Sequence, residues 1–124
     1  MVQLIPQPVL IASPGHPPKV ISEYIGRVST ETGAASVAVM ESPTGWSEPG
    51  QRPEFDEYTV VLSGVLSVET EGGSLRVASG QAVYAPAGEW VRYSTPDAGG
   101  ARYVSVCVPA FSPATVHRDE PPNA

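Results

Sequence analysis

Acidic residues in the middle of the chain carry groups that could exchange a proton with a bound molecule. Glu54, Asp56 and Glu57 lie close together, and mostly apolar residues follow them. A carboxylate held among apolar side chains such as Val61 and Val91 is disfavoured in its charged form, so its pKa rises toward the range of a general acid or base. This cluster is therefore where we expect acid–base chemistry, although loop acids are commonly just solvated.

Tyrosine hydroxyls supply a second component of such chemistry. Tyr93, or in its place Tyr84 or Tyr103, could donate a hydrogen bond to the oxygen of a developing enolate. A carboxyl group combined with such a donor suits the isomerisation, dehydration or cyclisation of a small carbonyl compound. This chemistry uses no redox cofactor. The alternative for Tyr93 is a core aromatic side chain whose hydroxyl is satisfied within the fold.

These residues lie on short runs that predict β-strands. Fourteen prolines and twelve glycines break the chain too often for long helices. Gly72-Gly73 indicates a hairpin, because glycine accepts the positive φ of a two-residue turn. Residues 23–28 could form either a strand or one helical turn. Many short strands with turns between them are typical of a barrel or sandwich. The apolar or alternating runs are Val9–Ile11, Val37–Met40, Tyr58–Leu62, Val65–Glu69, Leu75–Val77, Ala82–Ala85, Trp90–Ser94 and Tyr103–Val108.

Six residues have the spacing of two motifs, G-x5-H-x-H-x3-4-E-x6-G and G-x5-P-x-G-x2-H-x3-N. They are Gly45, Glu57 and Gly64 in the first motif, and Gly80, Pro86 and Gly88 in the second. On these residues the chain resembles the cupin superfamily. The resemblance implies an all-β fold with a single antiparallel cupin barrel, a double-stranded β-helix or jelly roll. It also implies an N-terminal arm with the first strands (1–34), a barrel core (35–111) and a C-terminal tail that folds over the barrel (112–124).

The metal ligands of this family are largely replaced. Gln51, Pro53 and Val91 stand where the motifs have histidines, so Glu57 is the ligand position that remains. A transition-metal site needs several imidazole, thiolate or carboxylate donors at one point. Both histidines of the chain lie outside the motifs and have no partner at ligand spacing. We therefore predict no metal and no other cofactor, with Glu57 as the catalytic acid or base.

Strand alternation sorts the neighbours of Glu57 if that residue points inward, as the resemblance implies. Thr59 and Val61 then share its face, whereas Tyr58 and Val60 face outward. By the same alternation, Val91 and Tyr93 face inward and Arg92 faces outward. The barrel interior is expected either to be filled by side chains or to hold one small ligand.

Other residues near the motifs are candidates for binding a substrate. Gln51 is a polar positioning group and Val91 an apolar wall, while Trp46 is either an aromatic wall or a packing or dimer-contact residue. Tyr103 and Cys107 are candidates in the last run, but the sequence leaves open whether they or the valines between them face the cavity. The apolar surroundings of Cys107 favour a buried, inert thiol over a nucleophile.

The tail beyond Cys107 is similar to the closing segment of small bacterial cupins, in which the chain folds back over the barrel. This resemblance would bring His117 over the cavity as a third catalytic group, since imidazole titrates near neutrality. The alternative is a surface cluster of His117, Arg118 and Asp119.

Composition limits the partners and the compartment. A chain of 124 residues forms one domain. Its net charge of −6 argues against a nucleic acid or an anionic membrane as a partner. One cysteine excludes an internal disulfide and suits a reducing compartment. No apolar run is long enough for a membrane helix, and no basic stretch precedes Val9–Ala12 as in a secretory signal. We expect a cytoplasmic protein.

Three functions remain open from the sequence. The first is a metal-independent isomerase, cyclase or lyase that acts on a small carbonyl-containing metabolite. The second is a non-catalytic cupin that binds or senses a small molecule. The third is a barrel filled by its own side chains that serves as a dimer scaffold. A homodimer is expected from the resemblance and because exposed strand edges invite pairing with a second copy.

Overall fold

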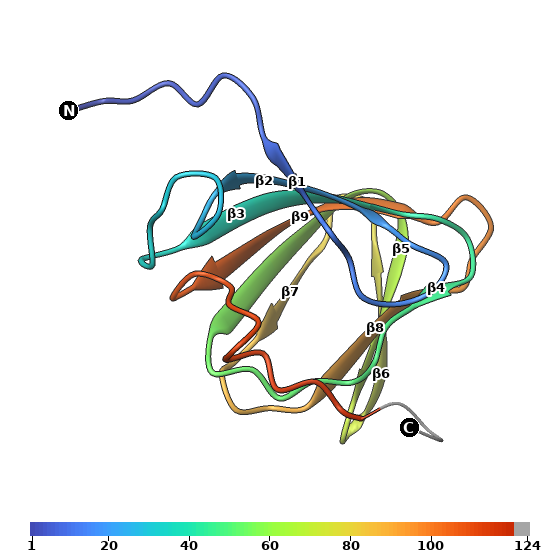
Figure 1. Cartoon of the computed structure of the whole chain (residues 1–124). Helices are drawn as coiled ribbons and strands as arrows, with labels where there is room; N and C mark the ends of the chain where they lie inside the picture. The colour runs from blue at the N-terminus through green and yellow to red at the C-terminus, as the bar shows by residue number, and fades with distance from the viewer. Residues whose placement is uncertain (121–124) are drawn as a thin grey trace.

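One long strand, β5 (Asp56–Thr70), organises an antiparallel sheet that curls into an open barrel in the computed structural model (Figure 1). The structure describes residues 1–120, and these residues form nine strands and no helix. The remaining strands are β1 (Val9–Ile11), β2 (Val20–Ile25), β3 (Ser36–Ser42), β4 (Trp46–Ser47), β6 (Gly73–Ala78), β7 (Ala82–Ala85), β8 (Val91–Thr95) and β9 (Ala101–Val108). The predicted all-β cupin barrel is confirmed.

A bend in β5 lets this strand serve both halves of the barrel. Its first half pairs with β7 and β9, and its second half pairs with β6 and β8. The bend lies at an irregularity between Val61 and Ser63. Gly64 follows with φ of +77°, and a Cβ there would lie 2.0 Å from the carbonyl oxygen of Gly100. Only glycine suits this position, which explains why a motif glycine stands there.

The strand predictions hold for most runs and fail at four places. One strand, β5, replaces the two runs predicted between residues 58 and 69. Neither β2 nor β4 was among the predicted runs, and the ambiguous segment 23–28 begins in β2 rather than in a helical turn. The β5–β6 turn is Glu71-Gly72, one residue before the predicted turn, because Gly73 already pairs with Thr70. Short or polar strands depend on partners that are distant in sequence, which hides them from local patterns.

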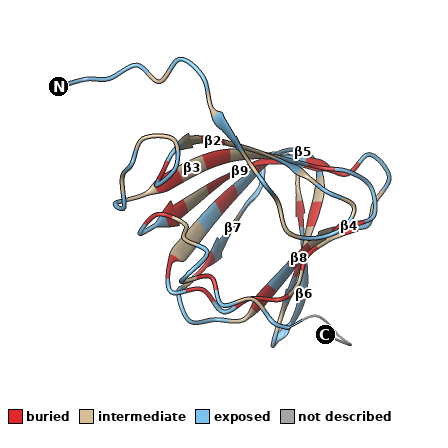
Figure 2. Cartoon of the chain, in the orientation of Figure 1, coloured by how far each residue is buried: buried red, intermediate tan, exposed pale blue. Residues whose placement is uncertain are grey.

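Alternation along the strands places side chains as the sequence predicted. Thr59 and Val61 are buried while Tyr58 and Val60 are about half exposed, and Val91 and Tyr93 are buried while Arg92 is exposed. On β9, the strand that the sequence left open, Tyr103, Ser105 and Cys107 face inward. Figure 2 shows the resulting alternation of buried and exposed segments along β3, β9 and β5. The apolar core fills one end of the barrel around Leu66, Val68 and Val77.

Two segments outside the barrel strands lie across its other end. The arm before β2 attaches at His16, whose backbone exchanges hydrogen bonds of 2.9 and 3.1 Å with that of Ser47. The tail after β9 runs beside residues 50–54, where Glu54 N donates to Thr115 O and Arg52 N to His117 O. The arm also contributes β1, which pairs with β2, to the sheet. Residues 121–124 of the predicted tail lie outside the described residues.

Candidate active site in the barrel cavity

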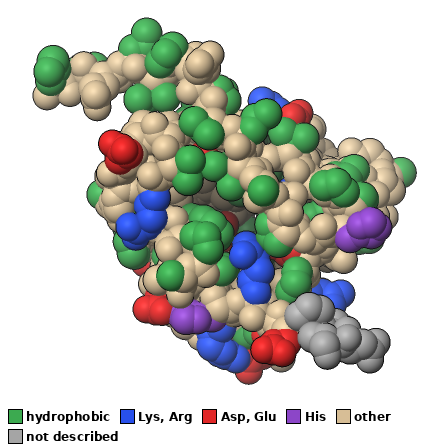
Figure 3. All heavy atoms as spheres, in the orientation of Figure 1, with side chains coloured by type: hydrophobic (Ala, Val, Ile, Leu, Met, Phe, Trp, Pro, Cys, Tyr) green, Lys and Arg blue, Asp and Glu red, His purple; other side chains and the backbone are tan. Residues whose placement is uncertain are grey.

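A cavity of about 160 Å³ lies between the inner face of the sheet and the two covering segments. Figure 3 shows this side of the molecule with a hollow near its centre. Strands β2, β3, β5 and β9 form one wall, and the arm and tail form the other. The wall is mainly apolar, and its larger apolar side chains are Ile11, Ile21, Met40, Phe55 and Phe111. The barrel is therefore not filled by its own side chains.

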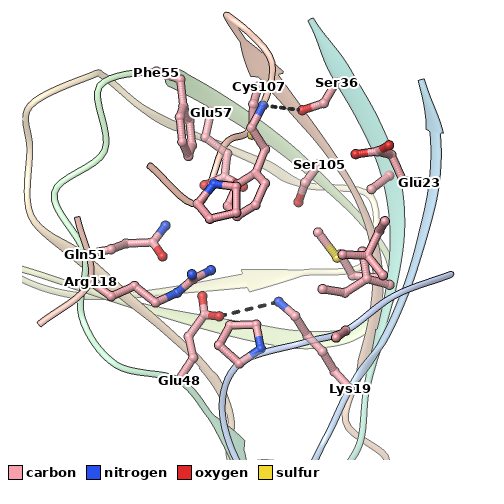
Figure 4. Close-up of a pocket in the computed structure, with 18 residues that line it drawn as sticks. Lys19, Glu23, Ser36, Glu48, Gln51, Phe55, Glu57, Ser105, Cys107 and Arg118 are labelled. Atoms are coloured by element: carbon pink, nitrogen blue, oxygen red, sulfur yellow. Dashed lines mark hydrogen bonds and ion pairs between the residues drawn. The ribbon is translucent and has the colours of Figure 1, made fainter. Parts of the chain in front are cut away.

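Glu57 projects from the start of β5 into the cavity (Figure 4). The Tyr93 hydroxyl donates a hydrogen bond of 3.1 Å to its Oε1. Burial raises the pKa of Glu57, and the nearby Glu48 carboxylate raises it further, whereas Lys19 and the Tyr93 hydrogen bond act in the opposite direction. Burial also raises the pKa of Tyr93 well above its usual range, which keeps this hydroxyl a donor. The cavity thus favours the carboxylic acid form of Glu57.

A buried ion pair forms the floor beside Glu57. Lys19 Nζ lies 3.7 Å from Glu48 Oε2, and the two side chains are 6% and 5% exposed. The ammonium also lies over the Trp46 ring, 4.3 Å from its centroid, where a cation–π interaction favours the charge. Burial lowers the pKa of Lys19, although the carboxylates of Glu48 and Glu57 oppose that change. Each charge needs its partner because an isolated buried charge is costly.

The tail contributes a further charged side chain, Arg118, to the cavity. Arg118 enters between Gln51 and Glu48 in the close-up view (Figure 4). Its backbone is held to that of Gln51 by an antiparallel bridge, and Asp119 N donates to Gly50 O over 2.7 Å. Gln51 is itself buried. The Arg118 guanidinium and the Gln51 amide therefore lie side by side at the end of the cavity opposite Glu23.

Smaller polar groups line the sheet wall near Glu57. Cys107 is buried, and burial raises the pKa of its thiol, so the inert state is favoured over the nucleophilic thiolate. The hydroxyls of Thr59 and Ser105 lie 3.3 Å apart, and Ser36 accepts a hydrogen bond from Phe111 N. These groups give the wall hydrogen-bonding capacity without adding charge.

The structure brings some of the predicted site residues to the cavity and leaves others beside it. Gln51, Glu57 and Cys107 line it. Tyr93 lies behind Glu57 and acts on that carboxyl group, so it is placed to position Glu57 rather than to contact a ligand. The side chains of Trp46, Val91 and Tyr103 are buried in the core instead.

His117 lies on the outside of the tail. Its side chain is about half exposed and pairs with Glu54, and its backbone has φ of +49°. The neighbouring residue, Arg118, is the one whose side chain reaches the cavity. His117 is therefore on the surface, as in the alternative that the sequence left open, but the predicted cluster with Arg118 and Asp119 does not form: Arg118 reaches the cavity and Asp119 accepts a hydrogen bond from Trp90.

Sequence reasoning missed Lys19 and Arg118, and it placed Glu48 only as an acid near the cluster around Glu57, without its partner Lys19. Lys19 follows a pair of prolines, which hides the run that it begins, and Arg118 lies in a segment without periodicity. A usable signal was present for Lys19, because Lys19, Ile21 and Glu23 alternate with Val20 and Ser22. That alternation predicts a strand with two charges on one face, which would demand partners if the face were buried.

The residues at the family's metal-ligand positions do not fit a metal. Pro53 and Val91 have no side-chain donor, and Gln51 offers only a neutral amide beside Glu57. Within residues 1–120, no group of three His, Cys, Asp or Glu side chains is arranged to hold an ion. The donor set therefore gives no basis for a metal-dependent step.

In residues 1–120, no helix is long and apolar enough to cross a membrane.

Comparison with known proteins agrees with this architecture. The model of the cupin domain family matches residues 38–107, more than half of the chain. The chain belongs to the cupin superfamily.

Individual relatives add the following. The chain is 46% identical over 103 residues to Endoribonuclease YbeY of Myxococcus xanthus (strain DK1622); the match covers 83% of this chain but spans only 35% of that protein. The polyketide cyclase RemF from Streptomyces resistomycificus is similar in structure, with a TM-score of 0.77 and 19% identity over 99% of this chain and 89% of RemF. A variant of Streptomyces PAC13 with uridine has a TM-score of 0.72 and 14% identity, covering 94% and 88% of the two chains. These structural likenesses show the fold.

Proposed function

We propose that the cavity binds a small carbonyl compound and that Glu57 moves a proton on it, without a metal. The observation that carries this proposal is the environment of Glu57, a carboxyl group that faces an apolar cavity and whose pKa is raised by burial. A raised pKa makes the carboxylate a stronger base and makes the acid available for return of the proton near neutral pH. A polyketide cyclase among the structural neighbours supports carbonyl chemistry on this fold.

The proposed step is an enolisation. The Glu57 carboxylate removes a proton from the carbon next to the carbonyl group, and the electron pair moves to the carbonyl oxygen. The Lys19 ammonium, which belongs to the ion pair on the floor of the cavity, stabilises the enolate oxygen. Glu57 then returns the proton to the enolate oxygen, which gives the enol isomer, or to the same carbon, which regenerates the carbonyl compound. Tyr93 holds the carboxyl group in place through its hydrogen bond to Oε1.

Uptake of deuterium from solvent tests the enolisation. Wild-type protein in D2O should exchange the protons next to the carbonyl group of 2-butanone, 2-oxobutanamide or 2-oxobutanoate, followed by NMR. Glu57→Gln should slow that exchange about 100-fold or more. Glu69→Gln is the matched control, because Glu69 lies on the same strand but is exposed and pairs with Arg92. Absence of exchange in all three compounds, or equal exchange in Glu57→Gln, contradicts the proposal.

A binding-only role is the second candidate. The cavity is covered on one side by the arm and tail, and its Lys19–Glu48 pair is already satisfied, which suits retention of a ligand. Binding of the same compounds without deuterium exchange would favour this role. Endoribonuclease activity is not proposed, because the chain corresponds to about a third of that relative.

We further propose that the outer face of the sheet is covered by a second copy of this chain. Tyr58, Val60 and Leu62 on β5 are about 45% exposed, and Tyr84 stacks on Tyr58 with ring centroids 4.9 Å apart. The apolar N-terminal arm before β1 extends away from its own barrel (Figures 1 and 3), so it is free to lie along a partner. Apolar patches of this kind mark protein contacts. When such a face pairs with the same face of a second copy, the two chains form a homodimer.

A further inference from the structure

Arg118 is the charged side chain of the cavity for which residues 1–120 provide no ion-pair partner. Its Nε is buried and has no hydrogen-bond partner among residues 1–120. No carboxylate in the described part of the chain forms an ion pair with it, and its guanidinium carbon lies 5.6 Å from the centroid of the Phe111 ring. A guanidinium keeps its positive charge in proteins, so a buried donor of this kind calls for an acceptor.

The other charges of the cavity already have partners. Lys19 and Glu48 form an ion pair. The Glu23 carboxylate accepts hydrogen bonds from the backbone N–H groups of Val28 and Ser29, at 3.2 and 2.8 Å. Figure 4 shows Glu23 on the side of the cavity away from Arg118. The end of the cavity formed by Arg118 therefore has one uncompensated positive charge.

The shape of this end favours one type of anion. The planar guanidinium presents paired N–H donors that match the two oxygens of a carboxylate, and the Gln51 amide beside it adds another donor. A phosphate dianion is less suitable, since one cation would face two negative charges while the Glu48 carboxylate lies nearby. The cavity of about 160 Å³ also limits size, because a cavity of about 150 Å³ accommodates benzene.

We propose that the cavity selects small monocarboxylates, with the ligand carboxylate on Arg118 and Gln51 and the rest of the molecule directed toward Glu57. Together with the proposed function, on which this assignment of substrate class rests, it identifies the carbonyl compound as a short oxo acid. Arg118 then fixes the distance between the bound carboxylate and the carbon from which Glu57 takes a proton.

Two matched probes test the selection. 2-Oxobutanoate and 2-oxobutanamide have the same size and shape and differ in charge, so calorimetric titration of each at pH 7 measures the preference for the carboxylate. Wild-type protein should bind 2-oxobutanoate about tenfold more tightly than the amide or better, the effect of one charge-assisted hydrogen-bonded pair. Equal affinities, or no measurable binding of 2-oxobutanoate, would overturn the proposal.

Variants then assign the preference to one residue. Arg118→Gln should abolish the preference, so that both probes bind with about equal affinity, and Arg118→Lys, which keeps the charge but not the planar fork, should reduce it. Arg92→Gln is the control, because Arg92 is exposed and pairs with Glu69 on the outside. An unchanged preference in both Arg118 variants would overturn the proposal, and circular dichroism shows that each variant folds.

The deuterium-exchange measurement separates the two proposals. A carboxylate preference that depends on Arg118, without deuterium exchange, supports the selection and contradicts the proton-transfer function. Exchange that depends on Glu57 but occurs equally in both probes supports the function and contradicts the selection.

Discussion

At the cavity end of β9, small polar side chains lie on the inner face of the strand and valines lie on the outer face. Along β9 the inward residues include Ser105 and Cys107, while Val104, Val106 and Val108 face outward. An antiparallel sheet with one wet face usually shows the reverse pattern. The difference teaches that the inner face here encloses a mainly apolar cavity in which a few polar and charged side chains stand, whereas the outer face exposes apolar side chains.

The largest effect is expected from breaking the inner ion pair. Lys19→Met leaves the Glu48 carboxylate buried without its partner and should lower the free energy of unfolding by about 3–5 kcal/mol. The double variant Lys19→Met/Glu48→Gln removes both charges and should recover most of that loss. Urea denaturation measures both. A loss below about 1 kcal/mol in the single variant contradicts the view that the pair is a buried structural unit.

A charge on the outer face should instead change assembly. Val60→Lys should convert a dimer into a monomer in analytical ultracentrifugation while changing monomer stability by only about 0.5 kcal/mol, since the side chain is already half exposed. Leu75→Lys, an equally exposed apolar position on β6, is the control and should leave the mass unchanged. A wild-type monomer, or a dimer that persists in Val60→Lys, would rule out this face as the interface.

The pH dependence of stability tests the environment of Glu57. Its pKa in the folded protein is raised above the unfolded value of 4.5, so the folded state holds this proton more tightly. The resulting stabilisation is fully present below pH 4.5 and is lost as the pH rises through the raised pKa. Glu57→Gln should therefore remove a slope of up to about 1.4 kcal/mol per pH unit over that window. Identical slopes for the two proteins would show that the site does not perturb Glu57.

The smallest effect is expected from the residue behind Glu57. Tyr93→Phe removes a hydrogen bond that lowers the pKa of Glu57, so the midpoint of the pH–rate profile should move to higher pH. Loss of the bond should cost about 1 kcal/mol of stability. A move to lower pH would show that Tyr93 acts on Glu57 in some other way.

The barrel could be predicted from the sequence because its backbone requires particular residue types at particular positions. Gly64 is needed where the backbone of Gly100 comes close, and alternation correctly sorted the residues around Glu57 and Val91. Alternation states which face a side chain takes, but it does not say whether that part of the face borders the core or the cavity. Tyr93 faces inward as predicted, yet it contacts Glu57 from the core side.

The charged part of the site could not be read from the sequence for a different reason. Lys19 stands at the edge of a short alternating run that follows prolines, Arg118 lies in a segment without strand periodicity, and long-range backbone hydrogen bonds determine how these segments cross the barrel. The pairing of the tail with residues 50–54 turns Arg118 inward and His117 outward. A shift of one residue would exchange them, and no local pattern fixes that register.

The most direct test of the account is a carboxyl ¹³C NMR titration of Glu57, assigned by comparison with Glu57→Gln. Our account predicts a midpoint above the ordinary value of 4.5 and a further change when 2-butanone is added. A midpoint at or below 4.5 that does not respond to the ketone would contradict the claim that Glu57 is the proton-transferring group of a ligand cavity.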